Sequence, residues 1–116
     1  MMGKIDQWST MQEFNAQQLH HYLANSEDKP FLLDVREVWE FERCAIEGSV
    51  LIPMGQVMSQ LEQLDPDRTT VVICHHGIRS RVIAIQLERA GFGQVINLAG
   101  GVDAWARDID LEMAVY

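Results

Sequence analysis

Basic residues, cysteines and prolines are scarce in this chain of 116 residues. Nine lysines and arginines face 17 aspartates and glutamates, which gives a formal net charge of -8. This shortage of positive charge argues against nucleic acid and anionic membrane as partners, because both are bound through dense basic surfaces. A small anion would gain no long-range attraction, so an anion site must be built locally from backbone dipoles and a few arginines.

Long apolar runs are missing as well. The polar segment Met1 to Thr10 lacks the apolar stretch of a secretory signal, and no run approaches the ~18 apolar residues of a membrane span. The two cysteines, Cys44 and Cys74, can form at most one disulfide bond. We therefore expect a cytoplasmic protein with reduced thiols. The length fits one compact domain.

What the chain does contain is an alternation of strand and helix patterns. Helical spacing and capping signals predict helices over 15–25, 37–43, 54–64, 80–90 and 100–105. Short apolar runs predict strands over 31–35, 50–52, 70–74 and 94–98. The strand ending at Cys74 is apolar on both faces and rich in β-branched residues, which suits the centre of a parallel sheet. The sequence thus predicts an α/β domain whose parallel sheet is covered on both faces.

Cys74 stands where such a strand ends, and ligands bind beyond the carboxyl ends of parallel strands. A tight turn follows and leads into a helix. Gly77 can adopt a positive φ, which lets successive N–H groups point inward. Together with the unpaired N–H groups of the helix start, they would form a cradle for a negative atom. Such a cradle favours a thiolate at Cys74; the alternative is a small apolar residue that ends a buried strand.

Four stretches resemble the signatures of rhodanese domains. Residues 72–80 resemble the active-site loop, and residues 32–37 resemble the Asp-x-Arg-Glu signature. Residues 46–53 are similar to the Ile-x-Gly-Ala…Ile-Pro stretch, and residues 97–105 to the closing Gly-Gly-x-x-x-Trp. The resemblance runs from about Phe14 to Arg107. It implies a single rhodanese-like domain over 1–116, with a core over about 12–108 and short extensions at both ends.

The resemblance implies the rhodanese fold, with a central, mainly parallel five-stranded sheet and helices on both faces. It also implies a sulfurtransferase in which Cys74 carries sulfur as a persulfide, from a donor such as thiosulfate to a thiol or protein acceptor. No cofactor or metal is implied. In the family, backbone amides of the loop hold the persulfide and its closing arginine, here Arg79, helps anchor donor anions. The loop residues of this chain are His75, His76, Gly77, Ile78, Arg79 and Ser80.

One departure from the family lies before the Ile-x-Gly motif. Many members have a histidine where this chain has Ala45, and small residues such as glycine are frequent where it has Cys44. We interpret the change as one of packing or partner surface, because the loop around Cys74 is intact. Cys44 could resolve a Cys74 persulfide as a disulfide, although the spacing does not place it near the loop.

Other polar residues have a structural and a chemical interpretation. Asp34 and Arg36 follow a neighbouring strand, where they could form a salt bridge that orients the turn or take part in the chemistry. His75 and His76 are interpreted as loop donors or partner contacts, with proton transfer and metal ligation as alternatives. Consecutive ligands are unusual in short metal sites. We expect a solvated helix face at Glu37, Glu40 and Glu42, and packing roles for Trp8, Trp39 and Trp105.

The sequence leaves two other functions open. Tyrosine phosphatases and arsenate reductases use a similar cysteine cradle, but five residues separate their cysteine from the arginine. Only four separate Cys74 from Arg79, and the smaller ring suits one sulfur atom better than a phosphoryl group. A non-catalytic rhodanese-like module, acting as a sulfur carrier, sensor or protein-binding domain, is the other alternative.

Overall fold

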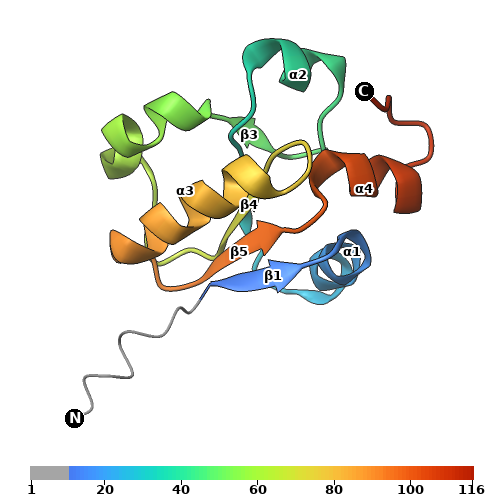
Figure 1. The fold of residues 1–116 in the computed structure, drawn as a ribbon. Helices are drawn as coiled ribbons and strands as arrows, with labels where there is room; N and C mark the ends of the chain where they lie inside the picture. Colours follow the sequence, from blue (N-terminus) through green and yellow to red (C-terminus); the bar gives the residue numbers. More distant parts are fainter. Residues whose placement is uncertain (1–10) are drawn as a thin grey trace.

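The structure is a computed structural model that describes residues 11–116, so the expectations for Met1 to Thr10, including Trp8, lie outside the described residues. One sheet of five strands forms its centre, in the order β1-β5-β4-β2-β3 (Figure 1). Every neighbouring pair is parallel, which confirms the predicted α/β class and five-stranded sheet. The strands are β1 (Gln12–Phe14), β2 (Phe31–Asp34), β3 (Val50–Leu51), β4 (Thr70–Ile73) and β5 (Val95–Leu98).

Within residues 11–116, four α-helices and two 3-10 helices accompany these strands, and the last helix follows β5. They are α1 (Ala16–Asn25), α2 (Val38–Arg43), η2 (Met54–Gln56), η3 (Met58–Gln63), α3 (Ile78–Arg89) and α4 (Gly101–Asp108). The side chain of Asn15 caps α1 by accepting a hydrogen bond from the Gln18 N–H. The prediction of an α-helix over 54–64 is wrong, because the segment folds as η2 and η3. Within 54–64 only Val57, which lies between η2 and η3, is buried, so the segment lacks the buried stripe that stabilises an α-helix.

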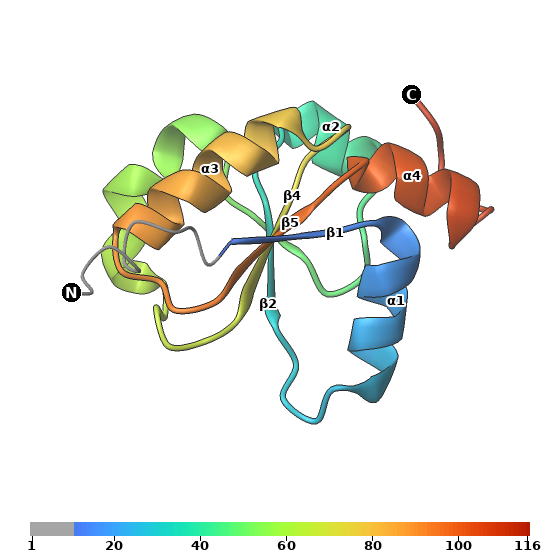
Figure 2. The ribbon, with the colours of Figure 1, turned by 60° about the horizontal axis from the view of Figure 1, so that its bottom comes forward.

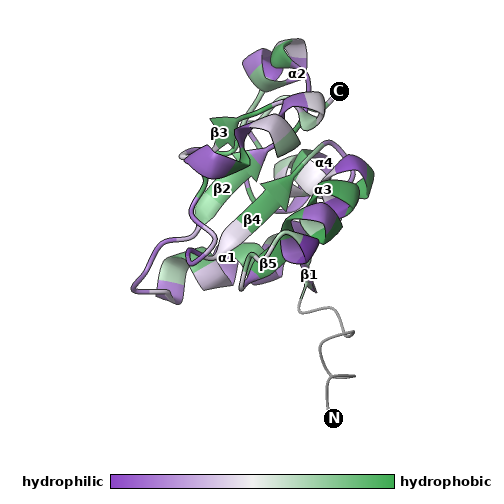
Figure 3. Cartoon of the chain, turned by 90° about the vertical axis from the view of Figure 1, so that its left-hand side faces the viewer, coloured by the Kyte–Doolittle hydropathy of each residue, from purple (hydrophilic) through white to green (hydrophobic). Residues whose placement is uncertain are grey.

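Alternating side chains of the strands build two hydrophobic layers. Leu33 and Val72 pack with residues of α3 on one face of the sheet. Their neighbours Leu32 and Val71 pack with α1 and α4 on the other face. Figure 2 shows α3 and α1 on opposite sides of the strands, and much of β2 and β4 is coloured as hydrophobic in Figure 3. The central strands β2, β4 and β5 are therefore buried on both faces, as is typical of parallel sheets.

The carboxyl ends of the central strands meet at one edge of the sheet. Asp34 of β2 lies opposite Ile73 of β4, so the segment after Asp34 runs beside Cys74. β5 is the other neighbour of β4 and leads directly into α4. Three connections therefore converge next to Cys74, where ligands bind in open parallel sheets. Within residues 11–116, no helix combines the length and the apolar character needed to cross a bilayer.

Candidate active site

The sulfur of Cys74 lies in a pocket of backbone N–H groups. Gly77 N–H donates to the Cys74 Sγ at 3.1 Å, and Ser80 N–H donates to it at 3.3 Å. Gly77 adopts φ 101° at the start of α3, and this turn aims both donors at the sulfur. Cys74 is only 1% exposed and also packs in the apolar layer under α3. One side of the sulfur thus faces hydrocarbon, whereas the other faces donors that stabilise a negative charge.

Asn97 ties the Cys74 turn to β5. The thiol of Cys74 donates to Ser80 Oγ at 3.3 Å, and the Ser80 hydroxyl donates to Asn97 Oδ1 at 2.5 Å. The Asn97 amide in turn donates to the Gly77 carbonyl at 3.2 Å and to Glu13 Oε1 at 3.0 Å. Asn97 is 2% exposed, so its polar atoms depend on these partners. The network fixes both residues whose N–H groups reach the sulfur.

The start of α4 holds the same turn from the other side. Val102 N–H donates to the Cys74 carbonyl at 2.9 Å, and Asp103 N–H donates to the His75 carbonyl at 3.0 Å. Gly101, the first residue of α4, has φ 59°, and a Cβ there would overlap both carbonyl oxygens. This close approach explains why the first residue of α4 is a glycine.

Arg79 points to Glu40 on α2. Its Nη1 and Nη2 donate to Glu40 Oε1 and Oε2 at 2.8 and 2.9 Å. Glu40 is 4% exposed, so the expected solvated face over Glu37, Glu40 and Glu42 is wrong at Glu40. The Arg79 hydrogen bonds lower the pKa of Glu40 to about 2. The carboxylate is therefore charged and holds the arginine that the resemblance assigned to donor anions.

Asp34 and Arg36 form a buried pair beneath α2. Arg36 Nη2 lies 2.8 Å from Asp34 Oδ2, and both side chains are fully buried. Arg36 also donates to the carbonyls of Glu40 and Cys44 at 3.2 and 2.6 Å. Burial opposes the charge of Arg36, but its bonds to Asp34 and to the Tyr116 hydroxyl raise its pKa above the usual value. The predicted salt bridge therefore joins Asp34 to Arg36 and supports α2, whereas its role in orienting the Cys74 turn stays a prediction.

Two loop histidines stack beside the site. The rings of His75 and His76 lie 3.9 Å apart with a tilt of 32°, and His75 stacks on Tyr116 at 3.9 Å. Burial and the neighbouring His76 lower the pKa of His75, so it is neutral near pH 7. Within residues 11–116 its buried Nε2 has no hydrogen-bond partner.

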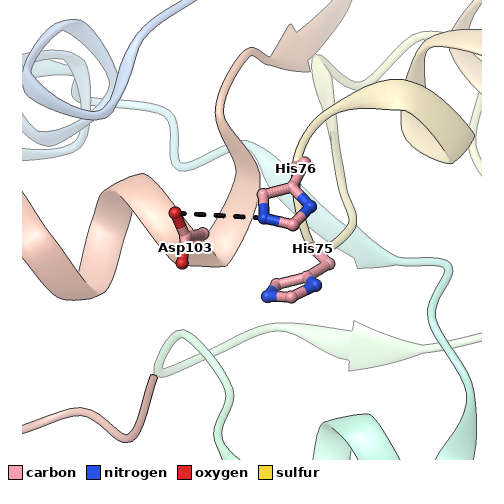
Figure 4. Close-up of side chains that lie close together, drawn as sticks. All are labelled: His75, His76 and Asp103. Atoms are coloured by element: carbon pink, nitrogen blue, oxygen red, sulfur yellow. Dashed lines mark ion pairs between the residues drawn. The ribbon is translucent and has the colours of Figure 1, made fainter. Parts of the chain in front are cut away.

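His75, His76 and Asp103 are the described side chains that could offer atoms to one metal ion (Figure 4). Their ligand atoms lie within 4.8 Å of one another, and His76 Nε2 is 4.0 Å from Asp103 Oδ2. That oxygen already accepts from Arg107 at 3.0 Å. A metal lies in the plane of each imidazole that binds it, whereas these two rings face each other. Ligation would therefore require the rings to turn.

The structure brings Cys74 together with Gly77 and Ser80, and it places Arg79 on the outer wall. Ile78 is 75% exposed at the start of α3. Cys44 and Cys74 are both free thiols, and Cys44 packs in the opposite layer. Trp105 is a core residue as expected, and Trp39 is 60% exposed but packs edge-on against Tyr116 at 5.7 Å between ring centroids.

Sequence reasoning missed three residues around the site: Glu40, Asn97 and Tyr116. Asn97 did leave a signal, because it is a polar residue inside a buried apolar strand. Tyr116 left none. Its hydroxyl accepts from Arg36 at 2.7 Å and donates to Glu40 at 3.0 Å, across about 80 positions of the chain.

Comparisons with known proteins agree with this geometry. The family model described as "Rhodanese-like domain" matches residues 15–108. A sulfurtransferase of Allochromatium vinosum is 34% identical over 95 residues, which cover 82% of this chain and 88% of that protein. The crystal structure of a rhodanese-like domain protein from Staphylococcus aureus superposes with a TM-score of 0.77 at 25% identity, covering 91% of this chain and 99% of the other.

A third similar protein is longer than this chain. "Putative sulfur carrier protein YrkF" of Bacillus subtilis is 37% identical over 82 residues, which cover 71% of this chain but 44% of that protein. The chain thus spans less than half of the length of this curated relative.

Proposed function

We propose, because this chain belongs to the family of rhodanese-like domains, that it transfers sulfane sulfur through a persulfide on Cys74. The observation that carries the proposal is the pair of N–H donors, from Gly77 and Ser80, directed at the Cys74 sulfur. Each such bond to a charged atom contributes about 1.5–3 kcal/mol. These donors stabilise both the Cys74 thiolate and the persulfide formed from it.

The chemistry has two displacement steps. The Cys74 thiolate attacks the outer sulfur of a donor such as thiosulfate, the donor S–S bond breaks, and sulfite leaves with the electron pair. An acceptor thiolate then attacks the outer sulfur of the persulfide, and the Cys74 thiolate is restored. The N–H groups of Gly77 and Ser80 hold the inner sulfur through both steps. The side chain of Arg79, which is 34% exposed, helps to anchor the donor.

The partners proposed for these steps are a small sulfur donor and a thiol or protein acceptor. A cytoplasmic setting fits two free cysteines. The alternative function is a sulfur carrier or sensor that binds a protein without turnover. The similarity to a protein named as a sulfur carrier supports this alternative. Turnover separates the two, because a carrier releases one sulfur atom per loaded molecule and an enzyme releases many.

A transfer assay tests the proposal with the two cysteines as matched variants. We expect wild type and Cys44→Ser to move sulfur from thiosulfate to an acceptor thiol over many cycles. Cys74→Ser lacks the nucleophile, and its rate should fall by at least about 10³-fold. Circular dichroism should show that both variants are folded. Transfer that survives in Cys74→Ser, or that is lost equally in both variants, would rule out the assignment to Cys74.

A further inference from the structure

The arginines around the Cys74 loop have carboxylate partners. The ion pairs are Arg36–Asp34, Arg79–Glu40, Arg81–Glu13 and Arg107–Asp103. The second of these involves a residue of the α3 start, directly before Ser80. A donor that reaches the sulfur therefore meets a guanidinium whose charge is already balanced. The net charge of -8 supplies no compensating attraction.

Glu40 is held firmly in this position. Besides both terminal nitrogens of Arg79, its oxygens accept from the Glu37 N–H at 2.8 Å and from the Tyr116 hydroxyl at 3.0 Å. The side chain of Glu40 is 5% exposed, against 34% for Arg79. A carboxylate with these partners does not swing away when an anion arrives. It remains a negative charge in the wall of the site.

We propose that Glu40 determines donor specificity: by holding Arg79 in a bidentate ion pair, it disfavours doubly charged donors such as thiosulfate relative to singly charged alkyl persulfides. The inference rests on the sulfur transfer proposed above and deepens it. Both donors give the same Cys74 persulfide. With thiosulfate, the S–S bond breaks and sulfite takes the electron pair; with an alkyl persulfide anion, an alkyl thiolate takes it. Neither reaction needs an outside oxidant. The two donors differ in charge, and the carboxylate of Glu40 acts on this difference.

The second-order rate constant for loading Cys74 tests this proposal, measured by quenched mass spectrometry with thiosulfate and with 2-hydroxyethyl persulfide. Glu40→Gln keeps the shape of the side chain and removes its charge. Because Coulomb energy is proportional to donor charge, we expect the constant for thiosulfate to rise about tenfold and that for the alkyl persulfide only about threefold.

Two control variants isolate the ion pair. Glu42→Gln removes the same charge from an exposed position of α2, and both constants should stay within about twofold of wild type because solvent screens the charge. In the double variant Glu40→Gln/Arg79→Gln the gain with thiosulfate should disappear, because no freed guanidinium remains. A gain that persists there overturns the proposal, as does an equal change for both donors or a slower reaction of folded Glu40→Gln with thiosulfate.

Wild type alone gives a second measurement, should Glu40→Gln fail to fold. A site that repels dianions should load faster from thiosulfate as ionic strength rises, and more steeply than from the alkyl persulfide. A constant for thiosulfate that falls with salt overturns the inference. Failure of the proposed function looks different, because wild type would then take up sulfur from neither donor.

Discussion

Glu40 shows how a single carboxylate can link stability to the chemistry of the site. It joins α2 to Arg79, and its hydrogen bond with Tyr116 adds the last residue of the described chain to the same network. The Arg79 hydrogen bonds lower its pKa from 4.5 to about 2. A carboxyl group whose pKa is lower in the folded protein stabilises the fold above its unfolded pKa. That contribution is lost as the pH falls from 4.5 towards 2.

Acid should therefore erase the difference between wild type and Glu40→Gln. Near pH 7 we expect the free energy of unfolding of wild type to exceed that of the variant by roughly 1–3 kcal/mol, a figure reduced for the partial exposure of Arg79. The difference should shrink between pH 4.5 and 2 as Glu40 takes up a proton. Urea unfolding at a series of pH values measures it. A difference that does not vary with pH would contradict the ion pair.

At the scale of elements, α4 acts as a clamp on the turn after β4. Its first N–H groups bind the carbonyls of Cys74 and His75, while the N–H groups at the start of α3 bind the sulfur. The turn is thus held by two helix starts, one directed at its carbonyls and the other at its side chain. Gly101 permits this approach, because any side chain at that position would overlap the turn.

Gly101→Ala should separate α4 from the turn. The added Cβ meets two carbonyl oxygens at a positive φ, so we expect a loss of at least about 2 kcal/mol in stability and slower loading of Cys74. Gly55→Ala is the matched control, since nothing lies within 4 Å of its Cβ and its effect should stay within about 0.5 kcal/mol. Urea unfolding compares the two variants. Equal stability of both would refute the clamp.

The elements differ in how far the sequence predicts them. The runs that became β2, β4 and β5 are apolar on both faces, and burial on two sides leaves that pattern in the sequence. β1 was missed as an element because only three residues, Gln12–Phe14, pair with β5. η2 and η3 were taken for one α-helix because their apolar spacing looks helical. The turn after Cys74 was predictable because its chemistry is local: a glycine, a strand end and a helix start.

Tyr116, Glu40 and Arg36 could not be connected in advance, because contacts across 80 positions depend on how α4 and the chain after it pack. The charge of Glu40 predicted an exposed side chain, yet Glu40 is buried because Arg79 of α3 pairs with it. Asn97 falls between these cases, since its place in a buried strand signalled a polar role without naming the partners.

The molecule as a whole combines an acidic surface with a small, locally built anion site. The chain has a net charge of -8, and yet the Cys74 sulfur accepts hydrogen bonds from two backbone N–H groups. Backbone dipoles are suited to this task because they stabilise a nearby charge without adding a mobile cation. The fold therefore stabilises a negative charge at the Cys74 sulfur, although the chain as a whole has few basic residues.

Intact mass spectrometry tests this central claim most directly, on wild type, Cys74→Ala and Cys44→Ala, before and after treatment with thiosulfate. We predict that wild type and Cys44→Ala gain the mass of one sulfur atom, that a reducing thiol removes it, and that Cys74→Ala gains none. An equal gain in Cys74→Ala, or no gain in wild type with any sulfane-sulfur donor, would contradict the account.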